Sequence, residues 1–139
     1  MTDLETAKAH LSGHSLCLCR DGAWFTDDGR GISPMLRLLE ENRDLRGYAA
    51  ADIIVGKAAA LLFVRAGIAA VYGEVMSAAG RATLEAHGIP CSFGVLTEKI
   101  INRRGDGICP MEQAVAAIDN ADEGYQALRD KLNSLRKKQ

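Results

Sequence analysis

The chain has 139 residues, of which 47% are hydrophobic and 25% charged, and its formal net charge is −1. This length suits one domain with a single core, because a chain of this size buries roughly two-thirds of its unfolded surface. A nearly neutral charge creates no strong attraction to nucleic acid or to an anionic membrane, so we expect neither as a partner.

The N-terminus and the cysteines favour a cytoplasmic protein. The first residues, MTDLETAKAH, predict a polar amphipathic helix and not a leader peptide. The most apolar run, from Ile53 to Val64, is shorter than the roughly 18 residues of a membrane helix, and Lys57 interrupts it. The cysteines lack the paired spacing of a zinc site, so we expect free thiols, no metal and no other cofactor. They are Cys17, Cys19, Cys91 and Cys109.

The first half of the chain predicts a helix, a hairpin, a second helix and a strand. The β-type runs SLCLC and AWFTD flank Asp21-Gly22, a pair typical of tight hairpin turns. Ser33 and Pro34 predict the N-cap and the first turn of a short amphipathic helix that extends to about Glu41. The segment LRGYAA then predicts a strand.

The middle of the chain alternates between helix and strand. Residues 51–67, ADIIVGKAAALLFVRAG, predict a buried helix that Asp52 caps and Gly67 ends. IAAVYGEV predicts a buried strand, and Ser77 caps a following helix that Gly88 ends. This alternation predicts an α/β sheet with helices on its faces.

The last third contains one more strand and two helices. After the predicted strand CSFGVLTEKI, the loop INRRGDGIC leads to Pro110, which opens a helix. From Asp122 the tail predicts a separate amphipathic helix with apolar residues at helical spacing. We therefore expect one domain over residues 1–121 and a helical extension over residues 122–139.

Lys57 is a candidate functional residue because an unpaired ammonium is expensive to bury. If Asp52 is the N-cap, Lys57 lies near the fifth helical position and needs a carboxylate or a bound anion to stay charged. Asp52 is the nearest carboxylate in the sequence. One interpretation is that the side chain extends to water past the neighbouring alanines. The other is an anion ligand or proton donor at the floor of a pocket.

Cys109 is a candidate nucleophile because Pro110 places it at a helix N-cap. The positive end of the helix, with Arg103 and Arg104 upstream, would lower the pKa of its thiol. Glu112 stands at the third helical position, where it completes a capping box or acts as a general acid or base. The structural alternative is an ordinary small residue with an ordinary cap partner.

Four segments of the sequence support a family resemblance when they are taken together. They read GIxP, ADxIVGKAAA, VMSAA and INRxGxGxCPME, and lie within about residues 4–118. As a set they resemble a family of small prokaryotic proteins of unknown function whose fold is that of the cytidine deaminases. The resemblance implies a three-layer α/β/α domain with a mixed sheet. A zinc deaminase needs H-x-E and P-C-x-x-C at two helix starts, which here read VGKAAA and MSAAGR, so we expect no zinc-dependent deamination.

The first functional hypothesis is a metal-free domain that binds a small anionic or nucleotide-like ligand. In the pocket that the resemblance implies, Lys57 replaces the H-x-E motif and Ser77 replaces the cysteines. Asp52 would support the lysine, and helix amides would contribute N–H groups. The polar loop that contains Asn102 and Arg103 could cradle an anion or be a solvated turn.

Two further hypotheses belong to other classes of function. One is an enzyme with Cys109 as nucleophile and with Lys57 or Glu112 as acid or base, in which Asn102 or Arg103 positions the substrate. The other is a protein-interaction domain whose C-terminal apolar stripe packs on a second copy, which leaves a homo-oligomer open. Such stripes also cover a domain's own core.

Overall fold

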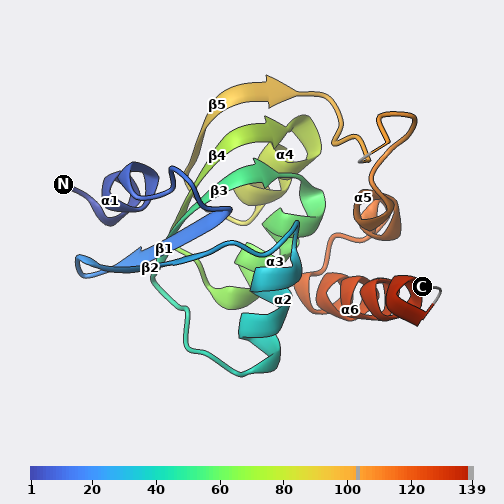
Figure 1. Cartoon of the computed structure of the whole chain (residues 1–139), viewed down its shortest axis with the longest axis horizontal. Coiled ribbons are helices and arrows are strands. Elements are labelled where there is room, and N and C mark those ends of the chain that lie inside the picture. Colours follow the sequence, from blue (N-terminus) through green and yellow to red (C-terminus); the bar gives the residue numbers. More distant parts are fainter. Residues whose placement is uncertain (103, 138–139) are drawn as a thin grey trace.

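The computed structural model describes residues 1–102 and 104–137, which contain six helices and a five-stranded mixed sheet of order β2-β1-β3-β4-β5 (Figure 1). The expected mixed α/β class is confirmed. The strands are β1 (Leu16–Arg20), β2 (Ala23–Asp27), β3 (Ala49–Val55), β4 (Ala70–Ser77) and β5 (Cys91–Thr97). The helices are α1 (Asp3–Ala9), α2 (Ser33–Glu40), α3 (Lys57–Ala66), α4 (Ala78–Ala86), α5 (Pro110–Val115) and α6 (Ala121–Lys137).

The sheet combines an antiparallel and a parallel part. In the β1–β2 hairpin, Arg20 pairs with Ala23, and the turn residues Asp21 and Gly22 have φ of 53° and 81°. Positive φ at both positions is the geometry of a two-residue primed turn, so the predicted hairpin is confirmed. β1 is also antiparallel to β3, whereas β3, β4 and β5 run parallel. The C-terminal ends of these three strands therefore share one edge of the molecule.

Apolar clusters lie on both faces of the sheet. Leu16 and Leu18 of β1 enter the larger cluster, which is shared with α2, α3, α4 and α6. Cys17 and Cys19 enter a smaller cluster beneath α1. This alternation is the period of two expected for a strand with both faces covered. Cys17 and Cys19 therefore share one face of β1.

The pleat of β3 and β4 shifts by one residue within each strand. Ala50 and Val55 both enter the larger cluster, although residues five apart face opposite sides of a regular strand. Val71 and Met76 of β4 show the same odd spacing. The two strands keep their mutual register on both sides of this point. We call this feature the pleat shift.

Asp52 lies inside β3, so the prediction that it caps the buried helix is wrong. α3 begins at Lys57 with Gly56 as its N-cap, because residues 51–55 pair with β4 and in part with β1. A continuous apolar run fits either a strand or a helix, and pairing with neighbouring strands decided between them. Asp52 Oδ1 accepts a hydrogen bond from the N–H of Ile54 at 3.2 Å. Burial raises the pKa of this carboxyl to about 7.

Other element boundaries agree with the sequence in part. Ser33 is the first residue of α2 and not its N-cap, which is Ile32, although Pro34 lies in the first turn as predicted. β3 begins only at Ala49, so most of the segment LRGYAA precedes the strand. The predicted end of the buried helix is confirmed, because Gly67 has φ of 76° directly after α3.

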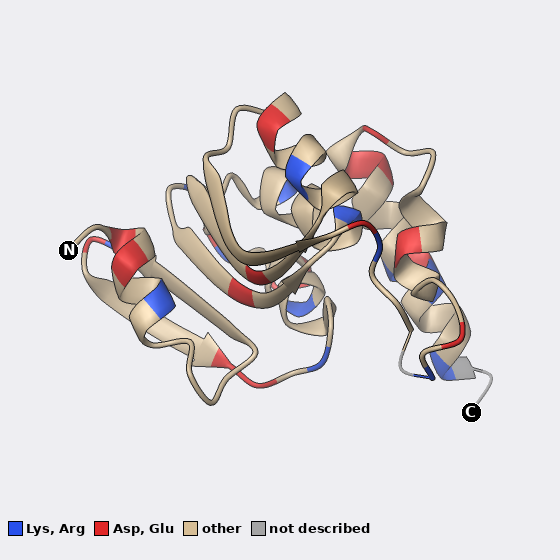
Figure 2. Cartoon of the chain, turned by 90° about the horizontal axis from the view of Figure 1, so that it is seen from above, with Lys and Arg blue, Asp and Glu red and all other residues tan. Residues whose placement is uncertain are grey.

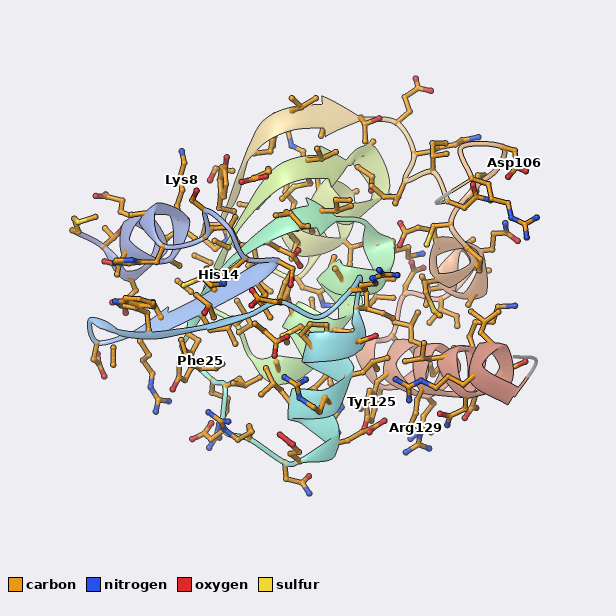
Figure 3. All side chains as sticks on the ribbon, viewed as in Figure 1. Lys8, His14, Phe25, Asp106, Tyr125 and Arg129 are labelled. Carbon is orange, nitrogen blue, oxygen red and sulfur yellow. The ribbon has the colours of Figure 1, made fainter. Side chains whose placement is uncertain are left out.

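The C-terminal helix packs on the domain through its predicted apolar stripe. Tyr125 and Leu128 are buried, and Leu132 contacts the larger cluster. Tyr125 is labelled on this helix in Figure 3. The Nε of Arg65 in α3 lies 2.8 Å from Oδ1 of Asp122 in α6. The stripe therefore packs on the protein's own core.

Acidic and basic positions are mixed along the described part of the chain (Figure 2). Within residues 1–102 and 104–137, no helix combines the length and the apolar character that a bilayer span requires.

We predict that Asp52 makes stability fall as the pH rises. Its pKa in the folded state lies above the unfolded value near 3.9, so the folded state binds more protons and loses stability between about pH 4 and pH 7. The free energy of unfolding of Asp52→Asn, relative to that of the native protein, should therefore rise by roughly 3–4 kcal/mol between pH 4 and pH 8. Urea unfolding at several pH values measures this. Asp130→Asn is the exposed control, and parallel pH profiles for Asp52→Asn and the native protein would refute the prediction.

Candidate functional site

The N-termini of α3 and α4 lie together at the C-terminal ends of β3 and β4. Gly80, in the first turn of α4, packs on the start of α3, since a Cβ at this position would lie 2.8 Å from the carbonyl oxygen of Val55. Ser77 is 1% exposed, and its Oγ accepts a hydrogen bond from the N–H of Gly80 at 3.0 Å. The predicted cap is confirmed, and the serine hydroxyl is used by its own helix.

The carboxylate of Glu112 occupies the N-terminus of α3. Its Oε1 accepts a hydrogen bond from the N–H of Lys57 and its Oε2 from the N–H of Ala58, both at 2.8 Å. These are two of the N–H groups that a helix start leaves without partners, and the helix dipole favours a negative charge there. The missing side chain of Gly56 leaves the necessary space, because a Cβ would overlap with the Glu112 carboxylate.

The side chain of Lys57 contacts the segment between α5 and α6. Its Nζ lies 3.1 Å from the carbonyl oxygen of Ala116 and 3.1 Å from Oδ1 of Asp119. Lys57 is the first residue of α3, so its predicted position near the fifth residue is wrong. Its ion-pair partner is Asp119 and not Asp52, the nearest candidate in the sequence. Its side chain is only 12% exposed, whereas that of Asp119 is 95% exposed. Backbone and side chain of Lys57 thus both hold the chain that follows β5.

Cys109 stands at the N-cap position of α5, but its side chain makes no capping hydrogen bond. The predicted capping box is wrong because Glu112 extends across to α3. The hydrogen bonds of Lys57 and Glu112 within the described part of the chain go to backbone groups and to Asp119, and none reaches the Cys109 thiol. The structure therefore does not bring a base to this cysteine.

Asn102 organises the loop before α5. Its Nδ2 donates a hydrogen bond to Oδ1 of Asp106 at 2.9 Å, and its Oδ1 accepts one from the N–H of Asp106 at 3.3 Å. Ile101 and Ile108 form a bridge at the base of this loop, and Figure 3 labels Asp106 on it. Arg103 lies outside the described residues. The contacts of Asn102 stay within the loop and do not reach the start of α3.

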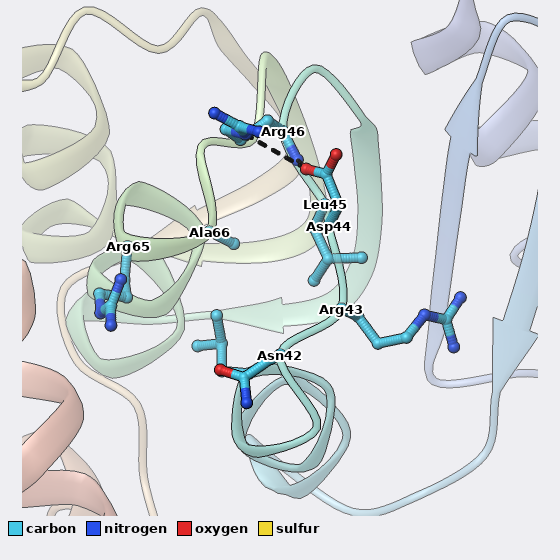
Figure 4. Close-up of a pocket in the computed structure, with 8 residues that line it drawn as sticks. Asn42, Arg43, Asp44, Leu45, Arg46, Arg65 and Ala66 are labelled. Atoms are coloured by element: carbon cyan, nitrogen blue, oxygen red, sulfur yellow. Dashed lines mark hydrogen bonds and ion pairs between the residues drawn. The ribbon is translucent and has the colours of Figure 1, made fainter.

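A pocket of about 340 Å³ lies at the opposite end of α3 (Figure 4). Residues 42–46 and Arg65 contribute to its wall. The Nε of Arg46 lies 3.2 Å from Oδ1 of Asp44, and Arg65 is paired with Asp122. The guanidinium groups of Arg46 and Arg65 in the pocket wall are thus already paired with carboxylates of the same chain. None of the described candidate residues lines this pocket.

Two participants were not predicted from the sequence: Ala116 and Asp119. A helix start that has glycine as N-cap supplies no capping side chain of its own. This was the available signal that a group from elsewhere in the chain satisfies α3. The identity of this group could not be predicted from the sequence, because Glu112 is 55 residues from Lys57. No cluster of three or more His, Cys, Asp or Glu side chains able to hold a metal occurs in residues 1–102 and 104–137.

Together these features define a small α/β domain in which the segment after the last strand is attached to the start of a central helix by a carboxylate. Residues 6–132 match the model of the TM1506 family, described as a domain of unknown function (DUF1893). The chain belongs to this DUF1893 family.

A solved structure has a similar fold. It is the crystal structure of the DUF1893 family protein TM1506 from Thermotoga maritima, with a TM-score of 0.74 and 22% sequence identity. The likeness covers 86% of this chain and 80% of that one. A search of curated proteins gives no match. The comparisons thus establish the family and the fold.

We predict that Glu112→Gln destabilises the protein by about 1–3 kcal/mol, because the amide nitrogen then faces an N–H group of α3. Gly56→Ala should also destabilise it, because its methyl group overlaps with the Glu112 carboxylate. Urea unfolding measures both effects. Glu41→Gln removes an exposed carboxylate from the end of α2 and should change stability by less than about 0.5 kcal/mol. An unchanged midpoint for Glu112→Gln would show that the contact contributes nothing.

We further predict that limiting iodoacetamide labels Cys109 first at neutral pH. Burial raises the pKa of the Cys17 thiol to about 11 and also raises the pKa of Cys19 and Cys91, which lowers their reactive thiolate fraction. Cys17 and Cys19 are also fully buried. Mass-spectrometric mapping of the modified peptides gives the order. Faster labelling of any other cysteine contradicts this prediction.

Proposed function

We propose that the protein is a metal-free, cytidine deaminase-like domain that binds a small anionic or nucleotide-like ligand at the N-terminus of α3. The observation that carries this proposal is the two-point contact of the Glu112 carboxylate with the N–H groups of Lys57 and Ala58. Two adjacent N–H groups at a helix start form an anion site, and a phosphate or carboxylate of a ligand offers the same oxygen geometry. Glu112 is then the internal anion that a ligand displaces.

The deaminase resemblance supports the location of this site. Zinc deaminases carry H-x-E and P-C-x-x-C at two helix starts. Here the corresponding helix starts are Gly56-Lys57 and Ser77-Ala78, and the close packing of Gly80 keeps them adjacent. The proposed site has the location of the deaminase zinc site but holds no zinc, because these positions lack the His, Cys and Glu that the zinc chemistry needs.

The proposal gives the candidate residues different roles. Lys57 supplies positive charge to the ligand, since its ion pair with the exposed Asp119 is weak and readily exchanged. Ser77 orders the start of α4. Asp52 shapes β3 through Ile54 and does not touch the ligand. The loop that contains Asn102 moves together with α5 when Glu112 leaves.

The thiol-enzyme alternative is not carried forward, because no observation brings a base to Cys109. We place the domain in the cytoplasm on the ground that its four cysteines are unpaired, as is usual in a reducing compartment. The interaction hypothesis based on the C-terminal stripe also lacks support, because Tyr125 and Leu128 of that stripe are buried against the core.

We predict that free anions rescue Glu112→Ala. This variant leaves the N–H groups of Lys57 and Ala58 without an acceptor, so formate or inorganic phosphate should raise its melting temperature saturably. A ligand present at tenfold its Kd adds about 1.4 kcal/mol of stability. Cytidine monophosphate in the same assay tests the nucleotide-like class. The native protein, whose site Glu112 fills, should respond less.

Three controls complete this experiment. Sodium chloride at equal ionic strength accounts for screening, and Glu41→Ala tests the loss of an unrelated exposed carboxylate. Adding Lys57→Met to Glu112→Ala removes the ammonium at nearly constant volume and should weaken the response to phosphate. If chloride, formate, phosphate and cytidine monophosphate act alike on Glu112→Ala, the response is a general salt effect with no preference for a ligand anion, and the proposed function fails.

A further inference from the structure

One outer edge of the sheet lacks the usual protection against pairing with another strand. β5 forms this edge and pairs with β4 on its other side. The sequence of β5, CSFGVLT, contains no charged residue and no proline, which are the residues that commonly prevent edge-to-edge association. The opposite edge strand, β2, carries Asp27. The free backbone N–H and C=O groups of β5 are therefore open to another strand.

An apolar row spans β3, β4 and β5 and ends at this edge. Ile54 of β3 pairs with Val75 of β4, which in turn pairs with Val95 of β5. Directly paired residues point to the same face. Because the following residues, Val55 and Met76, enter the larger cluster, this row faces away from α3 and α4. Val95 and Ile54 are 60% and 48% exposed, so α1 does not cover the row.

We propose that two copies of this chain associate by antiparallel pairing of their β5 strands, with Val95 opposite Val95 of the second copy. This register extends the apolar row from three residues to six across a two-fold axis, Ile54–Val75–Val95 in each copy. Such a contact is self-complementary, as a two-fold dimer requires. The two five-stranded sheets become one sheet of ten strands.

The charges near β5 fit this register. Extended by two residues, the pairing places Glu98 of one copy beside Ser92 of the other, and Lys99 beside Cys91. Arg81 of α4 lies over the ring of Phe93, with its guanidinium carbon 5.3 Å from the ring centroid. Burial raises the pKa of the Cys91 thiol, and the nearby Glu85 carboxylate raises it further. At each end of the contact, Glu98 and Lys99 of one copy therefore face the side of the other copy that carries Arg81 and Glu85.

The contact is also small, which determines how it should be measured. A single seven-residue edge strand buries less than the roughly 800 Å² per partner of a standard stable interface. We therefore expect a reversible dimer whose fraction rises with protein concentration. Sedimentation velocity over a concentration series should show the weight-average mass rising toward twice that of the monomer.

Two lysine substitutions in β5 test the register. Val95→Lys places two ammonium groups on the two-fold axis and should abolish the rise in mass. It should remain folded by circular dichroism, because Val95 is largely exposed. Ser92→Lys adds the same charge to the same strand, but opposite Glu98 of the second copy. This matched control should retain the dimer.

Disulfide crosslinking tests the same register in a different way. In a background with Cys91→Ser and Cys109→Ser, Val95→Cys brings two thiols face to face across the axis, within the reach of a disulfide. Oxidation should then give a covalent dimer on a non-reducing gel. Ser92→Cys is the control, because the register separates its two copies by about 20 Å along the strands.

Each contrary outcome overturns the proposal. A protein that stays monomeric throughout the concentration series does not pair in this way, whatever else binds to its edge. A dimer that survives Val95→Lys uses another surface. Crosslinking through Ser92→Cys in place of Val95→Cys excludes the register. None of these results depends on anion binding at α3, so this proposal and the proposed function fail independently.

Discussion

The arrangement of the chain after β5 depends on one contact, the Glu112 carboxylate on the N–H groups of Lys57 and Ala58. α5, which carries Glu112, has six residues, too few to be a stable helix without tertiary contacts. The ammonium of Lys57 adds a second attachment at Ala116 and Asp119. The same contact satisfies the start of α3, so each helix supplies what the other lacks.

These contacts explain why a lysine is found at the start of a buried helix. Its backbone N–H binds a carboxylate while its side chain binds the carbonyl of Ala116, so both polar groups of Lys57 are satisfied by one neighbouring segment. The free N–H groups and the helix dipole that bind the Glu112 carboxylate at the start of α3 would also bind a ligand anion. In the proposed function, attachment of α5 and anion binding would therefore compete for the same two N–H groups.

The pleat shift connects the interior of the sheet to its exposed edge. The side chain of Asp52 folds back along β3 and accepts a hydrogen bond from the N–H of Ile54, next to the pleat shift. After the shift, Val55 enters the core and Ile54 faces the opposite side of the sheet. A regular strand would reverse these two positions. A carboxyl whose pKa is raised by burial is thus adjacent to the apolar row that ends at Val95.

The sequence by itself determined the mixed α/β class and features that depend on neighbouring residues: the hairpin turn at Asp21-Gly22, the Ser77 cap and the start of α5 at Pro110. Such features follow from preferred φ and ψ values and from hydrogen bonds over three or four residues. Only the tertiary structure decided that residues 51–55 form a strand, because such a run becomes a strand or a helix according to what pairs with it. It also decided the partner of Glu112, since a carboxylate binds any helix start within reach, and chain folding alone determines which one that is.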